Sequence, residues 1–513
     1  MFWKMPNETV EKKVSGYPSN LFFILLIFGI VFSLISIANH YLFRTYALDL
    51  GVYNHALYSL SNFREPRFTL GLEGYDISFW GTHFSPITII YTPFYFLFGS
   101  YTLLIIQIVT ILLGGVGIYQ YSIGKLNSPK MSLLILICFF STWGIYSALS
   151  FDFHNNVIGA MLIPWFVYFL KKKKVSVAFL LFLLIISCQE NVALWMVFIM
   201  VGFITNELFS KNYLNDLKSL YFHLFLMVVS IAYFLIVILI LMPHFNQQTP
   251  QFFRYSLLGN SFTEIVASIV KYPGYAIKLI FTSSASTEIG HGIKAEFNIM
   301  VLLAGGIFLL YKPHYLIMLI PVYILKMLSN DPVLWGIDFH YSIEFVPIIS
   351  LCLIDSLASL DLNRKVLKGL LIIAMISTCA SNIKTMLTRN SSWYQKTNTI
   401  FWQNGHYSSG LDLEKVYGTI KLIPEKVAVS ASSPLIPHLC NREKIYQFPV
   451  VKDAEYIAIF KGSRGVYPID SERLKEDIES FRKDSEYIIV QENEDIILIK
   501  RKNLKEYPLV SKN

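Results

Sequence analysis

Carboxylate and imidazole side chains recur at short spacings in this chain, and they are the residue types best suited to chemistry. Asp49 lies in the segment Ala-Leu-Asp-Leu-Gly, His83 in Gly-Thr-His-Phe, and Glu190 in Gln-Glu-Asn. An Asp-Phe-His triplet occurs twice, at 152–154 and at 338–340. Such groups can accept a proton, donate one from a protonated imidazole, or bind a cation through oxygen and nitrogen ligands.

Hydrophobic residues dominate the composition of the 513-residue chain. They make up 54% of it and charged residues only 15%, and apolar runs approach the roughly 20 residues with which a helix crosses a bilayer. The chain is therefore expected to be an α-helical polytopic membrane protein with about eleven transmembrane helices. The apolar segments are 21–38, 101–123, 131–149, 156–170, 175–189, 191–206, 219–242, 298–311, 314–329, 343–359 and 367–384.

The basic residues indicate how the protein is oriented in the membrane. Many of them, including the run Lys171 to Lys174, lie in short loops between apolar segments. A cytoplasmic N-terminus places these loops inside, in agreement with the positive-inside rule. The net charge of +8 therefore predicts orientation in the cell membrane, not a nucleic acid partner. Counting 84–98 as a crossing would reverse every later loop, so this Pro-containing segment is expected to be a juxtamembrane or re-entrant helix.

In this orientation the candidate residues gather on the extracytoplasmic side. The long first loop, 39–100, carries Asp49 and His83, and the later carboxylates and imidazoles also lie in outer segments. The C-terminal region 385–513 lies on that side as well, after a membrane domain at 1–384. A small α/β domain is expected there, with β-rich runs at 426–430, 456–460, 487–491 and 496–500 and a Ser-capped helix at 471–483.

Each candidate also has a purely structural interpretation. Asp49 can cap a helix that starts at Leu50, His83 can open a helix, and Glu190 can mark a turn. The second triplet, 338–340, lies among aromatic residues that suit the membrane interface. The first triplet favours function, because alternation would place Asp152 and His154 on one side of an extended segment.

Longer motifs around these residues resemble a known family. The likeness spans nearly the whole chain, and the family is that of predicted prokaryotic membrane proteins with domain of unknown function 2079. It is carried by Asp49-Leu-Gly-Val-Tyr-Asn-His-Ala-Leu, Thr82-His-Phe-Ser-Pro, Phe151-Asp-Phe-His, Gln189-Glu-Asn-Val-Ala and Ser430-Ala-Ser-Ser-Pro-Leu-Ile-Pro-His-Leu.

The plan of the chain is also similar to the GT-C superfamily of membrane glycosyltransferases. One anchor helix is followed by a long outer loop with an early acidic residue, a Pro-containing segment and many spans. The resemblance implies that Asp49 acts at the acceptor. It also implies that Asp152 and His154 stand where some members hold a divalent metal such as Mg²⁺ or Mn²⁺, here with His in place of the second acid.

Sugar transfer from a lipid phosphate needs a base and groups that neutralise the departing phosphate. Asp49 is the expected base. The expected substrate-binding residues are His83, Glu190, His340, Arg44 and Arg64. The predicted function is therefore transfer of a sugar from a polyprenyl-phosphate donor to an acceptor outside the membrane. A transporter or lipid flippase, or a non-catalytic scaffold, remains an alternative, although the sequence has no matching halves of the kind that transporters commonly show.

Overall fold

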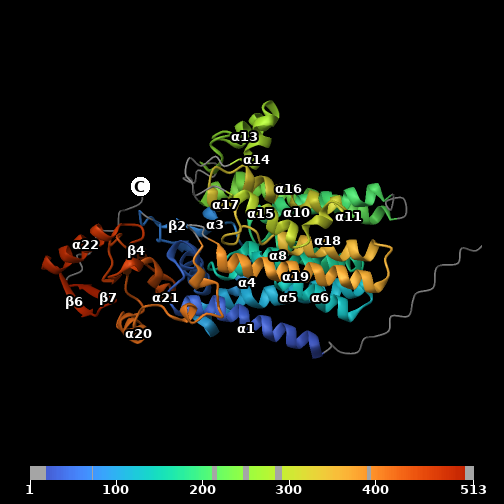
Figure 1. The fold of residues 1–513 in the computed structure, drawn as a ribbon. Helices are drawn as coiled ribbons and strands as arrows, with labels where there is room; N and C mark the ends of the chain where they lie inside the picture. Colours follow the sequence, from blue (N-terminus) through green and yellow to red (C-terminus); the bar gives the residue numbers. More distant parts are fainter. Residues whose placement is uncertain are drawn as a thin grey trace, which may run out of the picture.

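The computed structural model describes residues 19–71, 73–210, 216–245, 253–282, 292–389 and 394–502. Long helices run side by side through most of it, and a small sheet lies at one end of this bundle (Figure 1). The expected class, a many-helix membrane protein with a small C-terminal α/β unit, is confirmed.

The helices follow one another with short connections. They are α1 (Ser19–Tyr41), α2 (Val52–Ser61), α3 (Phe79–Thr82), α4 (Thr88–Phe98), α5 (Thr102–Leu126), α6 (Pro129–Phe140), α7 (Trp143–Leu149), α8 (Asn155–Lys171), α9 (Val175–Ile186), α10 (Glu190–Phe209), α11 (Leu217–Ile236), α12 (Met242–Phe245), α13 (Phe262–Lys271), α14 (Pro273–Phe281), α15 (Ile293–Leu303), α16 (Pro313–Met327), α17 (Pro332–Trp335), α18 (Phe345–Ser359), α19 (Arg364–Thr388), α20 (Leu413–Lys421), α21 (Ile436–Leu439) and α22 (Ser471–Lys483). A short π-helix, η1 (Ala47–Gly51), precedes α2.

Five helical stretches among the described residues are long and apolar enough to cross a membrane. They are Ser19–Tyr41, Thr88–Leu126, Glu190–Phe209, Leu217–Phe245 and Arg364–Thr388, and the pair α6 and α7, bent by 47°, would make a sixth. Other expected spans form shorter helices: α9 has 12 residues and α18 has 15. Helix α18 is buried along most of its length, so it is surrounded by other parts of the protein. Helix α1, in contrast, exposes Phe22, Phe23 and Ile27.

The Pro-containing segment 84–98 ends in a turn. Gly99 has φ of 53°, a left-handed conformation that glycine adopts without strain. The hydroxyl of Thr102 then reaches back to the carbonyl of Phe94 at 3.3 Å. A continuous helix would place residues 94 and 102 about 12 Å apart along its axis. Because the two residues are in contact, the chain bends between α4 and α5, although these helices together form one apolar stretch.

The C-terminal sheet contains five strands in the order β4-β3-β5-β7-β6. The strands are β3 (Val429–Ala431), β4 (Ile445–Gln447), β5 (Tyr456–Phe460), β6 (Tyr487–Glu492) and β7 (Ile496–Arg501). Strand β3 pairs in parallel with β4 and β5, whereas β7 pairs antiparallel with β5 and β6. The structure adds β4 to the expected strands, and the helix at 471–483 is capped by Asp470 instead of the expected serine.

The two faces of the sheet are buried against different partners. Ile457 and Ile459 of β5 pack with Leu474 of α22 in a small core, whereas Ala458 and Phe460 belong to the main hydrophobic core. Alternate residues of a strand point to opposite faces, which explains this division. The sheet is therefore joined to the bundle through an apolar face.

The first loop supplies much of the surface on which the C-terminal unit rests. The hydroxyl of Ser433 accepts the backbone N–H of Ala47 at 3.1 Å, and the imidazoles of His40 and His438 stack with centroids 4.0 Å apart. A Cβ at Gly51 would lie 3.0 Å from Ile436, so this glycine allows η1 to approach α21 closely. Figure 1 shows these segments together at the sheet end of the bundle.

Candidate active site

Asp152 fixes the backbone that carries Asp49. Asp152 has a left-handed backbone, with φ of 46°, and its side chain is buried. Its Oδ2 accepts the backbone N–H groups of Tyr46 at 2.9 Å and Leu50 at 3.2 Å, as the cap of a helix N-terminus does. The helical segment begins at Ala47, so the interpretation of Asp49 as the cap of a helix starting at Leu50 is wrong.

The side chain of Asp49 faces two stacked imidazoles. Its Oδ1 lies 3.3 Å from Nε2 of His154, and the ring of His340 stacks on that of His154 with centroids 3.5 Å apart. The Asp49 side chain is 29% exposed, whereas that of His154 is 10% exposed. A carboxylate oriented by an imidazole and still reachable from solvent can take a proton from a bound hydroxyl group.

His83 and Glu190 form a second pair in this region. His83 Nδ1 lies 3.4 Å from Glu190 Oε1 and 3.0 Å from Nε2 of Gln189. The other oxygen of Glu190 accepts the backbone N–H of Phe84 at 3.2 Å. Glu190 begins α10 and also holds the segment that carries His83, so it does more than mark a turn. His83 follows the short helix α3 and does not open a helix.

Arg254 brings a permanent positive charge to these residues. Its guanidinium is hydrogen-bonded to Tyr341 and paired with Asp331 at 3.7 Å. Its positive charge acts to lower the pKa of both His83 and His340, because it disfavours a second positive charge nearby. Arg254 and the imidazoles therefore act on one another electrostatically.

The imidazoles differ in the direction of their pKa shifts. Burial lowers the pKa of His83, but the hydrogen bond and charge of Glu190 outweigh it, and the net pKa is raised. Burial lowers the pKa of His154 and of His340. The charge of Asp49 raises the pKa of His154, but the effect of burial is larger. The site thus combines a histidine that favours its charged form with two that favour their neutral form. We call Asp49, His83, His154, Glu190 and His340 the acid-histidine cluster.

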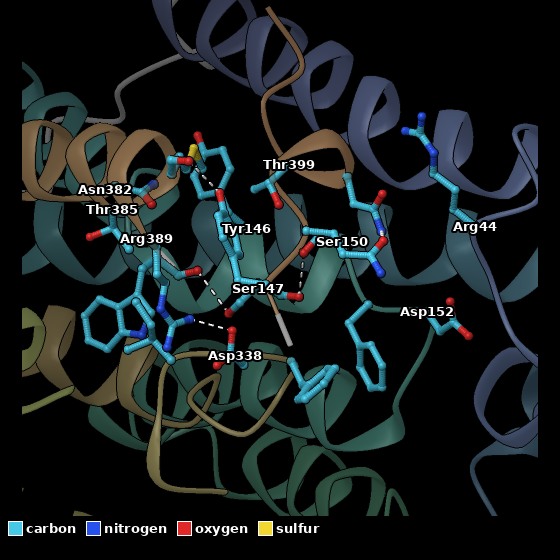
Figure 2. Close-up of a pocket in the computed structure, with 18 of the residues that line it drawn as sticks. Arg44, Tyr146, Ser147, Ser150, Asp152, Asp338, Asn382, Thr385, Arg389 and Thr399 are labelled. Carbon is cyan, nitrogen blue, oxygen red and sulfur yellow. Dashed lines mark hydrogen bonds and ion pairs between the residues drawn. The ribbon is translucent and has the colours of Figure 1, made fainter. Parts of the chain in front are cut away.

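A cavity of about 280 Å³ adjoins this cluster, because Phe151, which stacks on His154, lines it. Figure 2 shows the residues around the cavity. It is bounded by α7, by the C-terminal end of α19, and by the segments 150–152, 337–339 and 394–399. Arg389 and Asp338 form an ion pair at its edge, with Nη1 and Oδ1 2.5 Å apart.

The two Asp-Phe-His triplets lie where the cavity adjoins the acid-histidine cluster. Asp152 and Asp338 both line the cavity, whereas His154 and His340 stack on each other next to Asp49. Asp152 has a left-handed backbone, but its side chain and that of His154 both contact the segment 46–50 that carries Asp49.

The two arginines expected to bind substrate are engaged elsewhere. Arg44 lines the cavity, but its guanidinium donates to the backbone carbonyls of Thr397, His406 and Ser408 at 2.7 to 3.0 Å. Arg64 is exposed and paired with Glu443 of the C-terminal unit. Both join distant parts of the chain, so their placement gives no support to the predicted role in substrate binding.

The expected divalent metal has no ready set of ligands. Within the described parts of the chain, no group of three or more His, Cys, Asp or Glu side chains is placed to hold a metal ion. The Oδ2 of Asp152 is taken up by two backbone N–H groups, and Nε2 of His154 is directed to Asp49. Asp152 and His154 thus lack a third protein ligand among the described residues, and metal use stays a prediction.

Sequence reasoning missed several residues that shape this region. Gln107 of α5 donates to the carbonyl of Asp152 at 3.0 Å and accepts the backbone N–H of His154 at 3.2 Å, so it holds the first triplet. A polar amide inside an otherwise apolar run was the available signal. Arg389 follows the last residue of α19 and pairs with Asp338 of the second triplet. Sequence spacing does not reveal this contact.

The fold of the chain resembles that of a solved structure. It is similar to the crystal structure of ArnT from Cupriavidus metallidurans bound to undecaprenyl phosphate, with a TM-score of 0.50 and 10% sequence identity, covering 94% of this chain and 98% of that chain. At this identity the likeness shows the fold alone.

The sequence then places the chain within a family. Residues 39–498 match the family described as predicted membrane protein (DUF2079), and the chain belongs to that family. No curated protein matches the sequence. The matched range includes both the acid-histidine cluster and the C-terminal sheet up to Leu498.

Proposed function

We propose that the protein is an integral-membrane glycosyltransferase that moves a sugar from a polyprenyl-phosphate donor to an acceptor on the extracytoplasmic side of the cell membrane. The observation that carries the proposal is the arrangement at Asp49. Its carboxylate is partly exposed, is contacted by His154, and sits on a segment held by Asp152. The fold relative ArnT is bound to undecaprenyl phosphate, which supports a lipid phosphate as the donor group.

The phosphate of the donor would be held by His83 and Arg254. The raised pKa of His83 favours its protonated form, and Arg254 supplies a guanidinium that suits phosphate oxygens. Neutral His154 and His340 can add hydrogen bonds without adding charge. A charge-assisted contact to a leaving phosphate stabilises the negative charge that develops on it.

In the transfer step, an acceptor hydroxyl oxygen forms a bond to the anomeric carbon of the sugar as the bond from that carbon to the phosphate oxygen breaks. Asp49 takes the proton of the hydroxyl group, and the lipid phosphate leaves with the bonding electron pair. Atoms and charges balance, because the carboxylate becomes a carboxylic acid and the donor becomes a lipid phosphate monoester.

The experiment compares Asp49→Asn with wild type in proteoliposomes that contain undecaprenyl-phosphate-linked sugars. Loss of the base should lower release of undecaprenyl phosphate by about 100-fold or more. Asp76→Asn is the matched control, since Asp76 is another first-loop carboxylate but pairs with Arg67 at the surface. Equal turnover by wild type and Asp49→Asn would remove Asp49 from this role.

Metal use is a separate question for the same assay. If a metal acts with Asp152 and His154, chelation should stop turnover and added Mn²⁺ or Mg²⁺ should restore it. Turnover indifferent to chelator would exclude that metal role. A transporter or flippase would instead move the lipid across the bilayer with its sugar bond intact, which the same proteoliposomes distinguish.

A further inference from the structure

The cavity beside the acid-histidine cluster has a lining unlike that of a phosphate site. Aromatic rings contribute much of it, among them Trp143, Tyr146 and Phe151. Hydroxyl and amide groups contribute most of the rest, among them Ser150, Asn382 and Gln395. Figure 2 shows the side chains of Tyr146, Ser150 and Asn382 around this space.

The charged side chains of the described lining already have partners within the protein. Arg389 is paired with Asp338 at 2.5 Å and with Glu296 at 2.9 Å. Arg44 donates to three backbone carbonyls, and Asp152 accepts two backbone N–H groups. The donor groups of Arg44 and Arg389 are thus engaged by the protein, so an anion such as phosphate would have to compete with these contacts.

We infer that the cavity binds the neutral sugar ring of a substrate. A sugar ring has an apolar face that packs on aromatic rings and hydroxyl groups that bond to amide and hydroxyl side chains at its edge. The volume of about 280 Å³ is below the roughly 300–1,000 Å³ of pockets for drug-sized ligands, which suits a small ring. The indole N–H of Trp143, buried in the lining region, has no hydrogen-bond partner among the described residues.

The position of the cavity favours the acceptor as the source of that ring. Phe151 contacts Phe339 with centroids 4.1 Å apart, and Phe151 also stacks on His154. Both rings line the cavity, and through His154 the cavity adjoins Asp49, the proposed base, whereas His83 and Arg254, which would hold the donor phosphate, are not in its lining. This assignment rests on the proposed function, whereas binding of a sugar ring in the cavity does not depend on transfer.

The test measures thermal unfolding of the purified full-length protein in detergent, with glucose, galactose, mannose or arabinose as the probe. We expect at least one of these sugars to raise the Tm of wild type more than that of Ser150→Phe, whose ring fills the cavity. Ser33→Phe is the matched control, because Ser33 lines an apolar groove on α1 away from this cavity. Sugars also stabilise proteins by exclusion from their surface, but equally in all three proteins.

A second variant guards against misfolding of Ser150→Phe. Tyr146→Phe removes one hydroxyl from the lining without changing the shape of the ring, and it should reduce the sugar-dependent shift in Tm. Equal shifts in wild type and in both cavity variants would overturn the inference.

Undecaprenyl phosphate supplies the arm that separates this inference from the proposed function. Its stabilising effect should persist in Ser150→Phe and be lost in His83→Ala. A sugar shift without any undecaprenyl phosphate shift would contradict the proposed donor and leave the cavity assignment standing. In the turnover assay, Ser150→Phe should raise the KM for the acceptor if the ring belongs to the acceptor, and the KM for the donor if it belongs to the donor.

Discussion

Asp49 and Asp152 lie close enough for the charge of one to act on the other. Burial and the charge of Asp49 raise the pKa of Asp152 well above its ordinary value of 3.8. Its two backbone partners, Tyr46 and Leu50, need only an acceptor oxygen, which a neutral carboxylic acid also provides. Asp152 therefore serves as a fixed acceptor, whereas Asp49 is the more exposed carboxylate.

This division of roles predicts different outcomes for two substitutions of Asp152. Asp152→Asn keeps an acceptor oxygen for both N–H groups and should retain stability and turnover. Asp152→Ala leaves two backbone N–H groups unsatisfied at about 1–3 kcal/mol each, so it should lower the Tm and the turnover. Thermal unfolding of both purified variants is the measurement, and equal loss in the two would contradict the capping role.

His83 predicts a pH dependence of lipid phosphate binding. Its pKa is raised above 6.5 by Glu190, against burial and the charge of Arg254, while Asp49 adds to the rise. Its positive charge is therefore present at low pH and lost as pH rises through the raised pKa. Binding of undecaprenyl phosphate should weaken over that range, by about tenfold if one charge-assisted hydrogen bond is lost.

The control for this prediction is His83→Gln, which cannot titrate. The phosphate group of the lipid titrates as well, with a second pKa of about 6. This titration is the same in experiments with wild type and with His83→Gln. The difference between the two pH profiles therefore reports His83. Parallel profiles for wild type and His83→Gln would show that another group provides the charge.

At the scale of elements, η1 depends on partners from two remote parts of the chain. The loop before α8 caps it through Asp152, and the C-terminal unit supports it through Ser433 and α21. A short π-helix has few internal hydrogen bonds of its own, so these outside contacts hold it in place. The C-terminal unit thereby positions the segment that carries Asp49.

Ser433→Ala tests this support. The backbone N–H of Ala47 would lose its partner, at a cost of about 1–3 kcal/mol. We expect a lower Tm, lower turnover and faster proteolysis of the first loop. Ser485→Ala is the matched control at an exposed position of the same unit, and unchanged turnover in Ser433→Ala would mean that η1 holds its position without the C-terminal unit.

At the scale of the whole molecule, the orientation in the membrane is open to a direct test. The positive-inside rule places Lys172 in the cytoplasm and the first loop, with Glu73, outside. Lys172→Cys should therefore react with an impermeant thiol reagent only from the inside, and Glu73→Cys only from the outside. Labelling of both from one side would mean that the segment 84–98 crosses the membrane.

The sequence predicted patterns that repeat locally and missed contacts between remote segments. Strand β5 and helix α22 lie where their residue patterns predicted them, because each depends on a few neighbouring residues. The stack of His154 on His340 joins residues 186 positions apart, and the interactions of Arg44 depend on a tail more than 350 residues away. No local periodicity encodes such pairs, so the sequence alone predicts a ligand-binding role for Arg44 and does not reveal its contacts with the tail.

The ring contact between Phe151 and Phe339 also bears on how such a protein could evolve. The acids of both Asp-Phe-His triplets line the cavity, whereas their imidazoles stack on each other and that of His154 contacts Asp49. Substitutions around Ser150 or Asn382 can thus change which ring is accepted while the imidazole pair stays intact. We expect members of this family to differ in the residues that line the cavity and to retain the acid-histidine cluster. Substrate choice would then change faster in evolution than the chemistry.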